Sequence, residues 1–90
     1  MSRYSHIDYS MLPEHMQDGA RLYIENRIPP GSFMTAVLEN NLVEAAARAD
    51  SINKHALLDW AQWLYSECPS IAWGSPAAVD RWLSPPKEAT

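Results

Sequence analysis

The segment at residues 53–68 has the most regular apolar pattern in the chain and most constrains its fold. Its apolar side chains recur at intervals of three and four residues, the spacing of one helix face. These side chains are Leu57, Trp60, Ala61, Leu64, Tyr65 and Cys68. Together with Trp63, this segment has more apolar area to bury than any other segment. We therefore predict a central helix against which the rest of the chain packs.

Proline positions set the ends of the first and last predicted helices. Pro13 suits a first helical position, where its missing N–H would have no partner in any case. The first helix must end before Pro29, because a proline disfavours the α conformation in the residue before it. Ser75 as N-cap and Pro76 in the first turn form a strong helix start. The last helix is therefore expected at residues 76–83.

Polar residues predict two short helices in the middle of the chain. Ser32 is expected to cap a helix at residues 33–39. Asn41 is expected to cap a third helix at residues 42–49, with Glu44 completing a pair that resembles a capping box.

The fold class follows from these helix signals. A further cap at residues 50–53 separates the third helix from the central one, and a single kinked helix is the alternative. No run of β-branched residues alternates with polar ones, so no strand is expected. The sequence predicts an all-α fold, a compact bundle of four to five short helices with no sheet.

Ninety residues make one domain, near the lower end of what folds unaided. We place an N-terminal arm at residues 1–11, a single helical domain at 12–84 and a disordered tail at 85–90. Tyr4, Ile7 and Tyr9 are expected to pin the arm onto the domain, with a partly ordered terminus as the alternative.

Charge and cysteine content narrow the classes of partner and compartment. Seven basic and eleven acidic residues give a net charge of -4, which disfavours binding to a phosphate backbone. A single cysteine excludes an intramolecular disulfide and fits a reducing cytoplasm. The N-terminus has no apolar signal segment, and no apolar run approaches the roughly 20 residues that span a bilayer. We expect a cytoplasmic protein with no membrane association.

No residue pattern predicts catalysis, a metal or a cofactor. His6, His15 and His55 have no second histidine or cysteine at a metal-binding spacing. Cys68 has no nearby base and reads as a buried structural thiol. We therefore predict a protein that is not an enzyme. An enzyme subunit remains the last alternative, and a pocket that gathers His15 or His55 with carboxylates would support it.

The surplus of tryptophan predicts a surface for a protein partner. Trp63 lies off the apolar stripe, Trp73 lies in a linker and Trp82 lies in a short terminal helix. Because tryptophan is enriched at binding hot spots, these three are the predicted partner-binding residues. Two alternatives stay open: all four indoles belong to the core or to helix ends, or a homodimer buries the surplus.

A nucleic-acid-associated regulator is the alternative function. It would need a clustered basic face made from several of the dispersed cations. These cations are Arg21, Arg27, Arg48, Lys54 and Arg81.

A longer pattern carries a family resemblance. It comprises Ile28-Pro-Pro-Gly-Ser-Phe-Met-Thr-Ala-Val-Leu-Glu-Asn-Asn-Leu42, then Arg48-Ala49-Asp50, Leu64-Tyr65, Pro69 and Trp73-Gly74-Ser75-Pro76. Across residues 11–83 the chain resembles a family of small uncharacterised proteins encoded by bacteriophages and prophages. It departs from the family at Asn41, where Asp is usual, and at Ser66, where Asn is frequent.

The resemblance implies a viral or mobile-element protein in the bacterial cytoplasm, and it brings no catalytic residue or cofactor. Small acidic phage proteins commonly bind host proteins, including defence systems. The expected function is therefore to bind and modulate a host or phage protein, with an anti-defence, anti-CRISPR-like inhibitor as one form.

Overall fold

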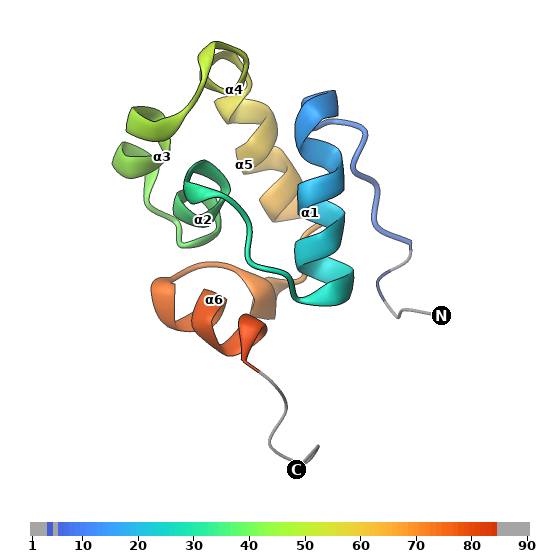
Figure 1. Cartoon of the computed structure of the whole chain (residues 1–90). Coiled ribbons are helices and arrows are strands. Elements are labelled where there is room, and N and C mark those ends of the chain that lie inside the picture. The colour runs from blue at the N-terminus through green and yellow to red at the C-terminus, as the bar shows by residue number, and fades with distance from the viewer. Residues whose placement is uncertain (1–3, 5, 85–90) are drawn as a thin grey trace.

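The computed structural model describes residue 4 and residues 6–84, which fold into six α-helices (Figure 1). The helices are α1 (Glu14–Asn26), α2 (Ser32–Leu38), α3 (Leu42–Arg48), α4 (Ser51–His55), α5 (Leu57–Ser66) and α6 (Pro76–Leu83), with a 3-10 turn at Ser70–Ala72. No strand occurs among these residues. The predicted all-α fold is confirmed.

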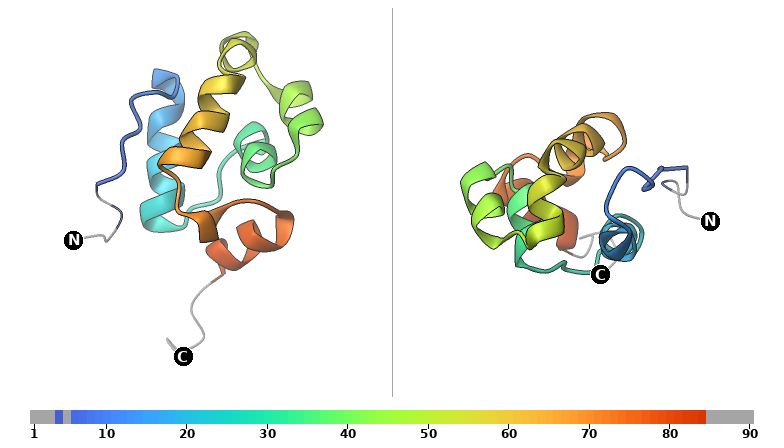
Figure 2. Two further views of the ribbon diagram at one scale, coloured as in Figure 1. Left: turned by 180° about the vertical axis from the view of Figure 1, so that it is seen from behind. Right: turned by 90° about the horizontal axis from the view of Figure 1, so that it is seen from above.

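The short helix α2 lies at the centre of the molecule (Figures 1 and 2). Five of its seven side chains are buried, which is typical of a helix enclosed on all sides. They are Phe33, Met34, Ala36, Val37 and Leu38. The Phe33 ring meets the edge of Trp60 in α5 at a centroid distance of 5.5 Å. At the other end of α2, the Leu38 carbonyl accepts a hydrogen bond at 2.8 Å from the backbone N–H of Gly74, which lies just before α6.

The prediction of one continuous central helix at residues 53–68 is wrong, because two helices, α4 and α5, cover this segment. Helix α4 begins earlier, at Ser51, and the chain leaves helical geometry at Ala56 (φ -105°, ψ 12°) before α5 starts. Ala56 N donates to the Asn53 carbonyl three residues back, which tightens this turn in the manner of a 3-10 helix. The third helix is separate from this element, because Ala49 is extended.

The buried face of α5 also differs from the predicted stripe. Trp60, Leu64 and Cys68 are buried as expected, but Ala61 and Tyr65 face outward. Trp63, which lies off the stripe, is 1% exposed. Its indole is covered because the N-terminal arm packs over this side of α5. The apolar periodicity of the helix does not predict such a contact with a distant segment.

The predicted caps at Asn41 and Ser75 are confirmed, the cap expected within residues 50–53 is Asp50, and two helix starts are shifted. The side chains of Asn41, Asp50 and Ser75 accept bonds from the backbone three residues ahead at 3.2, 2.7 and 3.1 Å. Ser32 is instead the first residue of α2, because extended Gly31 occupies the capping position and its carbonyl accepts the first bond. Pro13 is the residue before α1 rather than its first.

The N-terminal arm packs on the domain in its described part, as its aromatic residues predict. Ile7 and Tyr9 are buried. The carbonyl of Asp8 accepts a hydrogen bond from the Trp63 indole at 3.0 Å. The rings of Tyr4 and Trp82 pack edge to face, with their centroids 5.4 Å apart. The predicted disordered tail at residues 85–90 lies outside the described residues.

Two buried tyrosines offer a matched test of the core. The Tyr23 hydroxyl donates to the Ala72 carbonyl at 2.7 Å, whereas the Tyr9 hydroxyl has no hydrogen-bond partner within the described part of the chain. Burial raises the pKa of Tyr9 to about 12, so the hydroxyl stays protonated at neutral pH. We predict that Tyr9→Phe leaves the free energy of unfolding unchanged or raises it, whereas Tyr23→Phe lowers it by about 1–2 kcal/mol. Urea denaturation of both variants checks this, and equal losses would contradict it.

The stability of the core beside the break between α4 and α5 is expected to depend on Asn53. This side chain is buried, and its Oδ1 accepts a bond from the Trp60 indole at 3.0 Å. We predict that Asn53→Ala lowers the free energy of unfolding by about 1–3 kcal/mol, because a buried indole N–H loses its acceptor. The neighbouring exposed substitution Lys54→Ala should stay within about 0.5 kcal/mol of the wild type. Thermal unfolding of the two variants makes the comparison, and a similar effect from both would refute the role of the bond.

Candidate protein-binding site

Two of the three predicted partner-binding indoles lie in the core. Trp63 donates to the Asp8 carbonyl, and Trp82, which is 3% exposed, donates to the Tyr23 carbonyl at 2.9 Å. The Arg27 guanidinium lies 3.7 Å from the Trp82 ring centroid and covers that ring. In this conformation neither indole presents its ring to a partner. The alternative interpretation, in which the surplus indoles belong to the core, applies to Trp63 and Trp82.

Trp73 is the predicted indole that keeps exposed surface. It is half-buried against the core in the linker before α6, next to the 3-10 turn that carries the exposed Ile71. The structure does not gather the three predicted residues into one patch, because Trp63 packs on Tyr9 while Trp82 packs on other rings. Partner binding at Trp73 stays a prediction.

An apolar groove lies between α3 and α5. Its lining residues are Val37, Asn40, Asn41, Leu42, Ala45, Leu57, Trp60, Ala61 and Leu64. Its volume of about 90 Å³ is well below the roughly 300 Å³ at which small-molecule sites begin. The space therefore suits one apolar side chain of another protein better than a metabolite. Leu42, at the start of α3, is 71% exposed, and Val43 beside it is also exposed.

A second apolar surface runs along the outer side of α5. We call it the α5 ridge, formed by Leu58, Ala61, Gln62 and Tyr65, which line one open hollow together with the carboxylate-bearing Asp59. Leu58 is 82% exposed and Tyr65 is 89% exposed. Seen from behind, α5 crosses the near side of the molecule (Figure 2).

Sequence reasoning missed both surfaces for one reason. Ala61 and Tyr65 were assigned to the core because they share helical spacing with Trp60 and Leu64. A helix with apolar residues over most of its circumference does not reveal which part faces inward. Leu58, which lies off the predicted stripe, was the available signal for an outward apolar side of α5.

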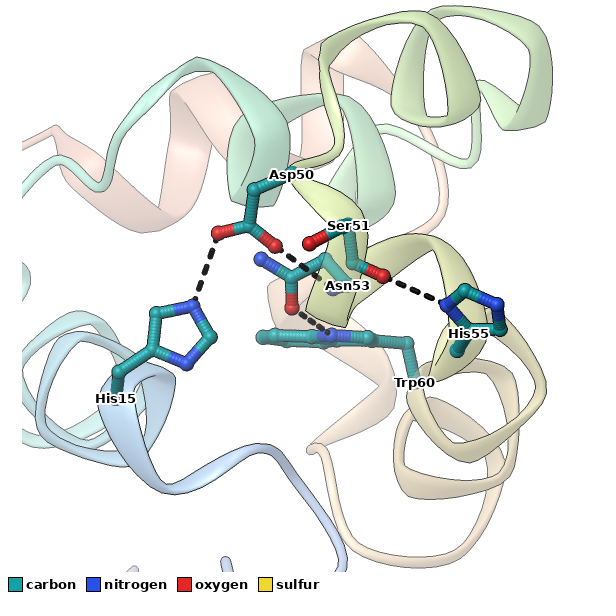
Figure 3. Close-up of polar contacts among 6 residues, drawn as sticks. All are labelled: His15, Asp50, Ser51, Asn53, His55 and Trp60. Atoms are coloured by element: carbon teal, nitrogen blue, oxygen red, sulfur yellow. Dashed lines mark hydrogen bonds and ion pairs between the residues drawn. The ribbon is translucent and has the colours of Figure 1, made fainter.

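A chain of polar contacts joins α1, α4 and α5 (Figure 3). His15 Nε2 lies 3.0 Å from Asp50 Oδ2, and Asp50 Oδ1 caps α4 by accepting from Asn53 N at 2.7 Å. Asn53 Oδ1 in turn accepts a hydrogen bond from the Trp60 indole N–H at 3.0 Å. The second histidine turns away, since His55 Nδ1 lies 2.8 Å from the carbonyl of Ser51 in its own helix.

This polar chain has a structural explanation. His15 and Asp50 are both exposed, and the hollow beside His15 is an open one lined by Pro13, Glu14 and Ile52. Both carboxylate oxygens of Asp50 are engaged, one of them by the helix cap. The contact joins the start of α1 to the cap of α4.

The other reactive groups are likewise enclosed or dispersed. Cys68 is buried, and burial raises the pKa of its thiol to about 12, so thiolate is scarce at neutral pH. Within the described residues, no three side chains of His, Cys, Asp or Glu gather where they could hold a metal ion.

Several basic residues have partners within the chain. Arg21 pairs with Asp18 at 2.7 Å, and Arg48 pairs with Glu44 at 2.7 Å. Arg27 stacks on an indole and donates to a backbone carbonyl. Three of the five cations named for a nucleic-acid face are therefore engaged within the chain.

Comparisons of the chain with protein-family models, with curated proteins and with solved structures found no match. The resemblance to phage and prophage proteins therefore stays a prediction. Within the described residues, no helix is long and apolar enough to cross a lipid bilayer.

The Asp50 contacts predict a specific acid sensitivity. The hydrogen bond from Asn53 N, followed by the contact with His15, holds the pKa of Asp50 below its usual value. A lowered pKa stabilises the fold above the unfolded pKa of about 3.9, and that stability is lost as the pH falls through the folded value. Asp50→Asn keeps a capping oxygen but cannot titrate.

We therefore expect the wild type to exceed Asp50→Asn in stability at neutral pH, and the difference to shrink between about pH 5 and pH 2. Denaturant unfolding over that range measures it, with Asp59→Asn as the control for loss of an exposed carboxylate. A difference that stays constant with pH would rule out this role for Asp50.

Proposed function

We propose that this chain is a non-enzymatic interaction protein that binds and modulates another protein through the groove between α3 and α5. The groove itself supports this best: an apolar hollow of about 90 Å³ with the 71% exposed Leu42 at its rim. Apolar residues exposed around a hollow are typical of protein-binding surfaces.

The dimensions of the groove favour a helical partner segment. Leu57 and Leu64 are seven residues apart, so they extend along about two turns of α5. A partner helix lying in such a groove would insert one apolar anchor between them and place its polar face in solvent. Asn40 and Asn41 supply hydrogen-bonding groups at the α3 end of the groove.

The biological setting of this proposal comes from the family resemblance. A phage or mobile-element protein in the bacterial cytoplasm would meet host or phage proteins as partners. Inhibition of a host defence system, in the manner of an anti-CRISPR, is one form of such modulation. A nucleic-acid-associated regulator is the second proposal, and the exposed Lys54 and Arg81 are the described cations that would support it.

The first experiment is affinity capture of the tagged chain from bacterial lysate, with and without phage infection, read by mass spectrometry. We expect one stoichiometric partner with the wild type and at least about a tenfold loss with Leu42→Glu, because a charge at the rim opposes apolar docking. The matched control is Ile71→Glu, an exposed residue of the 3-10 turn, which should retain the partner.

Two results would count against the groove. Equal recovery of a partner by the wild type and Leu42→Glu would move the binding site elsewhere. Loss with Ile71→Glu alone would place the partner beside Trp73 instead. Both variants change exposed side chains, so circular dichroism should show unchanged helix content.

A further inference from the structure

We propose that the N-terminal arm, residues 6–11, is a detachable cover that opens and closes over the Trp63 indole while the helices stay folded. In the closed state the arm buries an indole that the sequence predicts to bind a partner. Opening frees the indole N–H and the ring that Asp8 and Tyr9 occupy, so the arm is an autoinhibitory contact. This goes beyond the groove between α3 and α5, because it concerns the side of α5 that packs against the arm.

The arm runs alongside α1 (Figures 1 and 2), and few polar bonds hold it on the domain. Two of these bonds meet at Asp8. Its carbonyl accepts from the Trp63 indole, and its backbone N–H donates to Glu67 Oε1, each at 3.0 Å. The bond to Glu67 is exposed, so water competes for both of its groups. In the described part of the chain, no backbone-to-backbone hydrogen bond joins residues 6–11 to a helix, so the arm can leave without unwinding one.

A buried hydroxyl disfavours the closed state. The Tyr9 ring packs against Trp63 with the centroids 5.8 Å apart, and its hydroxyl is buried without a hydrogen-bond partner among the described residues. A buried polar group without a partner loses its hydration and gains no hydrogen bond in exchange. Opening of the arm returns this hydroxyl to water.

Apolar burial keeps the arm closed most of the time. Ile7 and Tyr9 are buried, and the Arg21 guanidinium lies 5.8 Å from the Tyr9 ring centroid. The base of the arm is fixed, because Leu12 is buried and its carbonyl accepts a hydrogen bond from the Gln17 side chain of α1 at 2.9 Å. The open state is therefore a minor one, in which the arm lifts and Leu12 stays in place.

Two indoles of α5 form a matched pair that reports on the arm. Trp60 and Trp63 are both 1% exposed, and each indole donates a hydrogen bond of 3.0 Å. Asn53 in α4 is the acceptor for Trp60, whereas the arm supplies the acceptor for Trp63. A difference in hydrogen exchange between the two indoles therefore separates opening of the arm from unfolding of the helices.

Hydrogen exchange of the two indole N–H groups, followed by NMR on the full chain over a series of low urea concentrations, tests the proposal. We expect the Trp63 indole to exchange at least about tenfold faster than the Trp60 indole, because it exchanges from the open state. Its rate should also depend weakly on urea, since lifting the arm exposes little surface. Equal rates with equal urea dependence would overturn the proposal, because the arm would then leave only when the chain unfolds.

Two variants should shift the arm in opposite directions. Glu67→Ala removes the acceptor for Asp8 N–H and should raise the ratio of the Trp63 rate to the Trp60 rate about threefold. Tyr9→Phe removes the unpaired hydroxyl and should lower that ratio at least about fivefold. Because the readout is a ratio within one chain, a change in global stability affects both indoles and cancels.

Asp59→Ala is the matched control for Glu67→Ala. It also removes a carboxylate from α5, about 12 Å along the helix from Glu67 at 1.5 Å per residue, and it should leave the ratio unchanged. A ratio that does not respond to Tyr9→Phe, or that responds equally to Asp59→Ala and Glu67→Ala, would show that the arm is not the moving part.

Discussion

The buried hydrogen bond from the Trp60 indole to Asn53 is the interaction on which the rest of the structure depends. The side chain of Asn53 is the buried polar one in the described core, and it belongs to α4, the helix that ends just before Ala56. Trp60 also packs against Phe33 of α2, and Asp50, which caps α4, lies against His15 of α1. An unpaired indole N–H in this core would cost about 1–3 kcal/mol, a large part of a small domain's stability.

The other buried aromatic rings extend the same principle to segments far apart in the chain. Three of them donate a polar hydrogen to a backbone carbonyl: Trp63 to the arm, Trp82 to the end of α1 and Tyr23 to the 3-10 turn. These bonds couple large apolar burial to directional contacts, so a chain of ninety residues gains a defined core. They also bury Trp63 and Trp82, two of the three indoles that the sequence predicts to bind a partner.

What remains for interaction is aliphatic surface on α3 and α5. The groove beside Leu42 and the α5 ridge share Ala61, yet they face different directions. The groove is narrow and suits one inserted side chain, whereas the hollow along the α5 ridge is larger and more open.

The sequence by itself determined the helical class and the caps at Asn41 and Ser75, and it placed a further cap within residues 50–53. These features depend on local chemistry, in which a capping oxygen or a proline acts on the backbone within a few residues. Only the tertiary structure decided which side of α5 is buried, where the central helix breaks and which indoles stay exposed. Those outcomes depend on contacts between segments up to 59 residues apart, such as Trp82 with Tyr23, and helical periodicity does not encode such pairings. For the same reason the candidate site lies outside the predicted residues. The sequence alone does not distinguish an apolar residue that the chain buries from one that stays exposed.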